Sequence, residues 1–163
     1  MRFHVKEHAI SLTDNFTVRD DANNVIFEVR GKLFHIGDHF TMYDSNGQEV
    51  MQMKQVLFAH TRQYEMSRNG VEVATMRKKE DAYPYNAHFE ITSRDGMAFY
   101  VQGNLDEWDL HIIDHYGRLL GNINREFSIL GDKYTVDTVP EADGAFMVAI
   151  AVLLDEIKED RQI

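Results

Sequence analysis

The feature that most constrains this chain is an unbroken apolar run near its C-terminus, residues 145–154, which lies between Asp143 and Asp155. A helix with one wet face shows a polar residue at every third or fourth position, and this run contains none. The run therefore predicts a helix that is buried on all sides. At 1.5 Å per residue it covers about 15 Å, half of the roughly 30 Å hydrocarbon core of a membrane, so we expect no transmembrane span.

Start signals place this helix at about residues 140–158. Residues 138–141, Thr-Val-Pro-Glu, are typical of a capping box with an early proline, and Asp143 offers a second N-cap. Burial of the large apolar side chains in this segment stabilises the fold by about 12 to 24 kcal/mol, at 1.5 to 3 kcal/mol each. We therefore expect the other residues to form a container for the helix.

Composition limits the class of protein. A chain of 163 residues suits one domain, which we place over residues 1–163. The net charge of −10 disfavours nucleic-acid binding, which relies on a basic face. The absence of cysteine excludes disulfides, thiolate zinc sites and cysteine nucleophiles. Residues 1–8 lack the apolar core of a signal peptide, so we expect a cytoplasmic protein.

Between residues 12 and 139 the pattern consists of short alternating segments separated by turn residues, which predicts antiparallel strands joined as hairpins. Pairs such as Asn69-Gly70 supply the positive φ angles that tight hairpin turns need. The predicted hairpins pair, in order, residues 16–19 with 25–29, 40–43 with 50–53, 64–66 with 71–73, 89–91 with 98–101, 110–113 with 119–123, and 127–129 with 134–136.

The early hairpins also repeat at an offset of 24 residues, since Asp14, Phe16, Thr17, Asp20, Leu33 and Phe34 recur as Asp38, Phe40, Thr41, Asp44, Leu57 and Phe58. A sheet of about twelve strands tends to close, and a barrel of that size is too wide for its own side chains to fill. A helix of 10 to 12 Å diameter fills such a lumen. We predict a mainly β fold: a closed antiparallel barrel of about twelve strands, built from six hairpins over residues 3–139, that encloses the C-terminal helix.

Three segments resemble the LURP-one-related family: residues 30–38 (Arg-Gly-Lys-Leu-Phe-His-Ile-Gly-Asp), the turn at 44–47, and residues 149–157 in the terminal helix. That family, here a bacterial-type member, belongs to the Tubby C-terminal-like superfamily with the phospholipid scramblases. The resemblance implies a twelve-stranded barrel around a central helix. Tubby proteins bind phosphoinositides through basic residues, and scramblases are linked to calcium and lipid. The chain shows no match to the scramblase calcium-binding segment.

Histidines raise the question of a metal site. His111 and His115, with Asp109 and Asp114, have helical i,i+4 spacing, but they lie in a strand and turn pattern. His35 and His39 flank a Gly-Asp connector. We interpret all of these as surface or loop groups and predict no metal site.

Carboxylates around the single Trp108 suggest a hydrolase as an alternative function. Nothing in the sequence fixes the roughly 5 to 9 Å separation that a glycosidase acid pair needs, and turn carboxylates explain the same residues. The chain contains no G-x-S-x-G, P-loop or G-x-G-x-x-G motif. We therefore predict no enzyme, no catalytic residue and no cofactor. The carboxylates concerned are Asp106, Glu107, Asp109 and Asp114.

The one basic run is Arg77, Lys78 and Lys79, with Arg62 and Arg68 near it in sequence. By analogy with Tubby it suggests binding of a phosphoinositide-like lipid head group, worth about 1 kcal/mol per basic residue near a charged surface. A solvated hairpin end explains the run equally simply. Methionines on the predicted strands are expected to pack against the helix: Met42, Met51, Met53, Met66, Met76 and Met97.

Together these observations predict a non-enzymatic binding or scaffolding module that binds a protein or lipid partner. Because the helix fills the lumen, we expect the binding site on the outer wall or at an end of the barrel. The alternatives are a lipid head-group binding protein that uses Arg77, Lys78 and Lys79, and a hydrolase.

Overall fold

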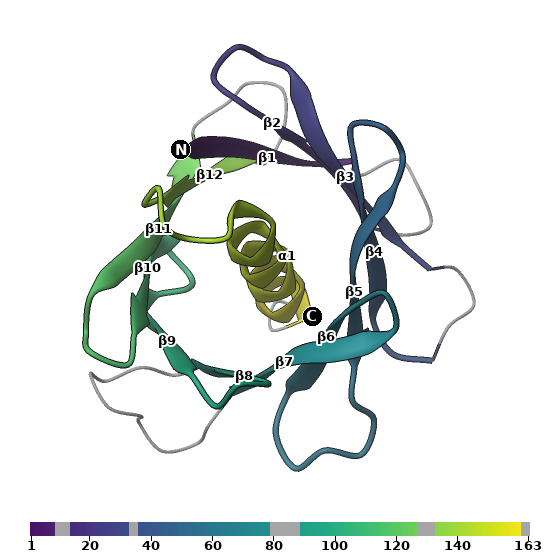
Figure 1. Cartoon of the computed structure of the whole chain (residues 1–163), viewed down its shortest axis with the longest axis vertical. Helices are drawn as coiled ribbons and strands as arrows, with labels where there is room; N and C mark the ends of the chain where they lie inside the picture. The colour runs from purple at the N-terminus through teal and green to yellow at the C-terminus, as the bar shows by residue number, and fades with distance from the viewer. Residues whose placement is uncertain (9–13, 33–35, 79–88, 127–132, 161–163) are drawn as a thin grey trace.

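Twelve antiparallel strands close into a barrel around one helix, α1 (Gly144–Asp160), which lies at the centre of the ring (Figure 1). The computed structural model describes residues 1–8, 14–32, 36–78, 89–126 and 133–160. This arrangement confirms the predicted fold class. The strands are β1 (Arg2–His8), β2 (Asn15–Arg19), β3 (Val25–Gly31), β4 (His39–Asp44), β5 (Glu49–Gln55), β6 (Gln63–Arg68), β7 (Val71–Lys78), β8 (Phe89–Ser93), β9 (Ala98–Asn104), β10 (Asp109–Asp114), β11 (Leu119–Glu126) and β12 (Lys133–Thr138).

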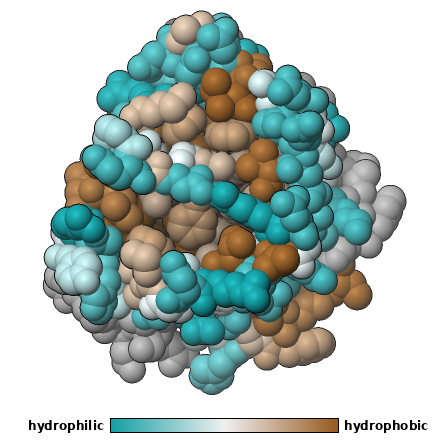
Figure 2. All heavy atoms as spheres, viewed as in Figure 1, coloured by the Kyte–Doolittle hydropathy of each residue, from teal (hydrophilic) through white to brown (hydrophobic). Residues whose placement is uncertain are grey.

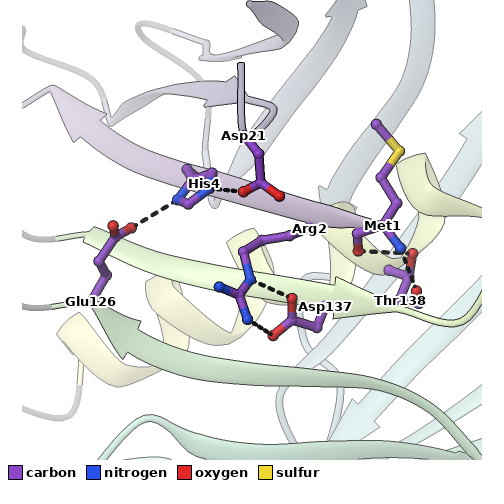
Figure 3. A network of polar contacts seen from close by, with 7 residues as sticks. All are labelled: Met1, Arg2, His4, Asp21, Glu126, Asp137 and Thr138. Atoms are coloured by element: carbon purple, nitrogen blue, oxygen red, sulfur yellow. Dashed lines mark hydrogen bonds and ion pairs between the residues drawn. The ribbon is translucent and has the colours of Figure 1, made fainter. Parts of the chain in front are cut away.

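Each strand pairs with its neighbours in sequence, and β1 closes the barrel against β12 (Figure 3). Across this seam Arg2 Nε donates a 2.7 Å hydrogen bond to Asp137 Oδ1. His4 lies between two carboxylates, with Nε2 2.7 Å from Asp21 and Nδ1 3.0 Å from Glu126. These two hydrogen bonds raise the pKa of His4, since both favour the charged imidazolium. Polar contacts on the outer wall thus support the ladder that joins the first and last strands.

The strand β1 was not among the predicted hairpins. Only Phe3 and Val5 are apolar in a segment that otherwise carries charge and histidine, so its alternation is short and weak. A second difference concerns β11, which ends at Glu126, three residues beyond the predicted end at residue 123. The strand predicted at 127–129 lies outside the described residues.

Turn chemistry follows the prediction between β6 and β7. Asn69 and Gly70 both have positive φ, 51° and 75°, as a two-residue type I′ turn requires. In the turn between β4 and β5 only Gly47 has positive φ, and the ladder slips between Met42 and Tyr43. The extra turn residue there is absorbed by a bulge in the pairing.

The helix begins at Gly144, four residues later than predicted, and Asp143 is its N-cap. Asp143 Oδ1 accepts a 3.2 Å hydrogen bond from the Phe146 amide, and the Asp143 carbonyl accepts one of 3.0 Å from Met147. The predicted capping box at 138–141 is therefore wrong. The Val139 amide instead donates to the Leu120 carbonyl, because this segment still continues the barrel wall.

The helix fills the lumen. Every residue from Met147 to Leu154 is 2% exposed or less, and inward-facing side chains of the strands pack around it. On the face shown in Figure 2, apolar residues gather in the middle, and hydrophilic residues predominate around them, with some apolar residues at the margin. Within the described residues, α1 lacks the length and continuous hydropathy of a membrane-crossing helix. The predicted buried helix is thus confirmed.

Strand methionines line this core, as predicted, with one exception. Met97 is 49% exposed, because it precedes β9 in the turn that follows Gly96. The expectation that it packs against the helix is wrong. The buried methionines on the strands are Met42, Met51, Met53, Met66 and Met76.

Candidate functional site

Inward-facing positions turn from apolar to acidic at the end of the barrel where α1 ends. On β1, Phe3 and Val5 are buried in the lumen, and the period of two makes Glu7 the next residue on the same face. Glu7 is only partly exposed. The first strand therefore adds a carboxylate to the end of an otherwise dry core.

The 24-residue repeat adds further polar groups at this end. Asp14, Asp38 and Arg62 each directly precede a strand and lie two residues before a buried aromatic side chain. Their carbonyls accept equivalent hydrogen bonds from the amides of residues 31, 55 and 78, at 3.1, 2.8 and 2.9 Å. The three positions are therefore structurally equivalent, and in the third hairpin an arginine replaces the aspartate.

The helix supplies the remaining carboxylates from its last turns. Asp155 and Glu156 are 8% and 7% exposed, and Glu159 is partly buried. The carbonyl ends of helical peptide units concentrate partial negative charge at this terminus, so the dipole adds to the charge of the side chains. The helix that fills the barrel thus also places three acids at its exit.

These carboxylates form two groups that share Glu159. In each group the three carboxylate oxygens, one per residue, all lie within 4.8 Å of one another. We call the set the acidic cluster. Its first group is Glu7, Asp155 and Glu159, and its second is Asp14, Glu156 and Glu159.

Crowding and burial shift the ionisation of the cluster. Burial, a hydrogen bond with Glu159 and the charge of Asp155 raise the pKa of Glu7 to about 10. Burial and a hydrogen bond with Asp14 raise the pKa of Glu156 to about 9. Both shifts favour the neutral acid, because ionised carboxylates repel one another in a site of low dielectric. At neutral pH some of these side chains therefore hold protons.

Tyr134 of β12 extends into the same region. Its side chain is 3% exposed, and its hydroxyl has no hydrogen-bond partner among the described residues. Burial, together with the charges of Asp155, Glu7 and Glu159, raises its pKa well above the usual value. The ring stacks on Trp108 with centroids 4.5 Å apart. A buried hydroxyl thus lies beside the acidic cluster with its hydrogen-bonding capacity unused within the described structure.

Asp38 differs from the cluster because it has a cationic partner. Arg62 Nη2 lies 3.2 Å from Asp38 Oδ2, and the Tyr64 hydroxyl donates a 2.7 Å hydrogen bond to the same oxygen. Arg62 Nε in turn donates to the Tyr64 hydroxyl at 3.0 Å. Arg62 and Tyr64 together thus compensate the charge of Asp38 at this end of the barrel.

The predicted basic site lies elsewhere, on the outer wall. Arg77 is exposed on β7 and its Cα partner on β8 is Glu90. Lys78 is partly buried, and Lys79 lies outside the described residues. Arg77 and Arg94 both line a shallow hollow. The opposite charge of Glu90 weakens the positive potential that the run alone suggests.

The histidine and carboxylate candidates serve local structure. His111 pairs with Asn122, at 3.9 Å from Asp109, and the His115 ring packs edge-on against Tyr116. His39 Nε2 lies 3.3 Å from Gln52 Oε1, and His35 lies outside the described residues.

Among the acidic residues near Trp108, Asp114 holds a turn with its carboxylate, whereas Asp106 and Glu107 take part in a turn through their backbone amides. Asp114 accepts hydrogen bonds from the Tyr116 and Arg118 amides, at 2.8 and 2.9 Å. The Asp106 and Glu107 amides both donate to the Asn104 side chain. These contacts fit the turn interpretation of the carboxylates, and sequence reasoning gave no role to the members of the acidic cluster.

Comparisons with known proteins agree with this fold over nearly the whole chain. The family model for LURP-one-related proteins matches residues 1–155. A protein of Bacillus subtilis, "Uncharacterized protein YxjI", is 26% identical over 153 residues, covering 94% of this chain and 91% of its own. "Protein LURP-one-related 15" of Arabidopsis thaliana is 22% identical over 173 residues, covering 93% and 78%.

A solved structure shares the architecture. The X-ray structure of an Arabidopsis thaliana protein superposes with a TM-score of 0.70 at 16% identity, covering 96% of this chain and 91% of that one. At this identity the likeness concerns the fold alone, and it agrees with the barrel and its central helix. The chain belongs to the LURP-one-related family.

Proposed function

We propose that the protein is a non-enzymatic binding module that takes its ligand at the end of the barrel where α1 ends. The lumen is no site for a ligand, because Met147 to Leu154 fill it and are at most 2% exposed. A binding surface therefore lies on the outer wall or at an end. The acidic cluster marks one of these ends.

One observation carries the proposal: buried acids and the Tyr134 hydroxyl are gathered where an apolar core would be more stable. Burial of polar groups without full hydrogen bonding costs free energy, and like charges add to the cost. Groups with strongly shifted pKa values also concentrate at functional sites. A binding role explains why such a set persists at the end of a well-packed barrel.

The hydrolase alternative receives no comparable support from the described residues. Of the carboxylates that suggested it, Asp114 is engaged in a turn with the Tyr116 and Arg118 amides. Lipid head-group binding at Arg77, Lys78 and Lys79 stays a second proposal, supported by the hollow that Arg77 shares with Arg94. Glu90 opposite Arg77 weakens that support.

The proposal is tested by a screen of ligand classes, read by thermal unfolding of the full chain. Salts, sugars, phosphates, amino acids and short peptides are compared on the wild type, Glu159→Gln and Glu141→Gln. Glu141 is an exposed acid before the helix, so Glu141→Gln is the charge-matched control. We expect a ligand that stabilises the wild type and Glu141→Gln but not Glu159→Gln. A ligand that acts equally on all three would place the site elsewhere.

A further inference from the structure

We propose that the acidic cluster binds a hard divalent cation of the calcium class. This inference rests on the proposed function, because it takes the same end of the barrel as the binding site. The cluster offers only carboxylate oxygens, contributed by β1, by the residue before β2, and by α1. Hard cations prefer oxygen ligands of this kind.

The spacing of these oxygens suits one ion in each group. Calcium binds oxygen at 2.3 to 2.6 Å, so two ligands on opposite sides of the ion are roughly 4.6 to 5.2 Å apart. The three oxygens of each group lie within 4.8 Å of one another, inside that span. Glu159 belongs to both groups, so its two oxygens suit either one shared ion or a closely spaced pair.

Tyr134 gives an independent observation that points to a ligand at this end of the barrel. Its side chain is 3% exposed, comes from a different strand, and has no hydrogen-bond partner for its hydroxyl among the described residues. Tyr134 is the cross-strand partner of Val5 on β1 and packs in the same core, and Glu7 of the first group is the next inward-facing residue after Val5. Glu156 is 7% exposed, and its Oε2 likewise lacks a partner in the described part of the chain. A bound, partly hydrated cation would supply partners to both.

Charge at this end also favours a cation. Arg62 is committed to Asp38 and Tyr64, at 3.2 and 3.0 Å. Lys158, in the last turn of α1, places its Nζ over the Trp108 ring, 5.2 Å from the centroid. The carboxyl terminus of the helix adds its own negative partial charge. A divalent cation between the acids would remove their mutual repulsion in the ionised form, and it is small enough to fit there.

Calcium is favoured over magnesium and zinc by the donor set. Zinc sites in proteins generally include histidine or cysteine ligands, whereas both groups here contain carboxylates alone. Magnesium demands near-ideal octahedral geometry and keeps much of its water, whereas calcium accepts many carboxylate oxygens in flexible arrangements. Side chains from three separate segments suit the more flexible ion.

The test is calcium titration of the full-length, chelator-treated protein by isothermal titration calorimetry, paired with thermal unfolding. We expect saturable binding with a Kd at or below about 1 mM and a rise in Tm of a few degrees. Glu159→Gln and Asp14→Asn should each weaken binding by about tenfold or more. Glu141→Gln should bind as the wild type does. Circular dichroism tests whether each variant is folded, and Asp14→Asn carries the test if Glu159→Gln does not fold.

Several results would overturn the inference. The first is that calcium up to about 10 mM gives neither binding heat nor a change in Tm. The second is that folded Glu159→Gln and Asp14→Asn bind calcium as the wild type does. The third is that the protein binds zinc in preference to calcium. If calcium fails while a ligand from the screen stabilises the wild type but not Glu159→Gln, the proposed function stands and the cation inference falls. If calcium binds and both cluster variants lose it, both stand.

Discussion

Arg62 and Asp38 hold equivalent places in successive hairpins and pair with each other, with Arg62 Nη2 3.2 Å from Asp38 Oδ2. The pair also engages the buried Tyr64, whose hydroxyl donates to the same carboxylate oxygen at 2.7 Å. At the third position of the repeat, Arg62 stands in place of the aspartate. It pairs with Asp38, so this pair carries no net charge, in contrast to the acidic cluster.

Loss of the Arg62 side chain should destabilise the fold. We expect Arg62→Gln to lower the free energy of unfolding by about 1 to 3 kcal/mol, because Asp38 keeps its partly buried charge and loses its cation. Arg118→Gln is the control, since that side chain is 74% exposed and Asp114 retains two amide donors; it should cost about 1 kcal/mol or less. Urea unfolding measures both. Equal losses in the two variants would contradict the buried role of Arg62.

The calcium-free protein should lose stability from the acidic cluster as pH rises. Glu7 and Glu156 have folded pKa values of about 10 and 9, above their ordinary value of 4.5, so the folded state binds more protons across this range. Stability from these groups is therefore greatest below pH about 4.5 and falls as pH rises through both folded values. The groups that face them are Asp14, Asp38, Asp155 and Glu159, and Asp38 is paired with Arg62.

Glu7→Gln isolates this effect, because it keeps the side-chain shape and removes one titration. With chelator present, we expect the variant to be more stable than the wild type at pH about 9 and to differ little near pH 4. Urea unfolding at a series of pH values checks this. A wild-type advantage that grows toward high pH would contradict the burial of Glu7 among carboxylates.

Binding to vesicles of generic anionic lipid should be absent at physiological salt. Arg77 faces Glu90 across the β7–β8 ladder, and the chain carries a net charge of −10. Co-sedimentation in the presence of a chelator measures this without cation bridging. Strong binding that is abolished by neutralising Arg77, Lys78 and Lys79 together would favour the lipid head-group proposal instead.

The central helix should be essential to the fold. Ala149 is fully buried, so Ala149→Asp should lower the free energy of unfolding by several kcal/mol, out of a typical total of 5 to 15. Ser45→Asp, at an exposed turn, adds the same charge and should have little effect. Thermal and urea unfolding compare them.

Deletion of the residues after Asp143 extends this test. The truncated chain leaves the inner faces of the strands wet, and we expect insoluble protein. A soluble truncated product that melts cooperatively would show that the helix is not the core of the barrel.

Much of this fold was predictable because its signals are local. An all-apolar helix, Asn-Gly turns and alternating strands each have a clear pattern, and the barrel follows from the need to enclose the helix. The strand β1 and the N-cap at Asp143 were harder. The alternation of Arg2–His8 is short, and Thr138 and Val139 stay in the wall although they resemble a helix start.

The acidic cluster was not predicted, because its members are far apart in the chain and meet only when the barrel closes. The alternation of side chains along β1 puts Glu7 after Val5 on the inner face. The position of α1 along the barrel axis brings Glu159 beside Glu7. One signal was available: Asp14 and Asp38 recur two residues before a buried aromatic. Side chains two positions apart in a strand lie on the same face, so each aspartate is expected on the same lumen-facing side as the aromatic residue that follows it.

Sensitised terbium luminescence tests the cation site most directly, because lanthanides bind calcium-type oxygen sites and the single Trp108 stacks on Tyr134, 4.5 Å away between ring centroids. Excitation at the red edge of tryptophan absorption should give terbium emission that excess calcium displaces, that Glu159→Gln abolishes and that Glu141→Gln retains. Absence of sensitised emission, or emission of equal strength in folded Glu159→Gln, would contradict cation binding at the acidic cluster.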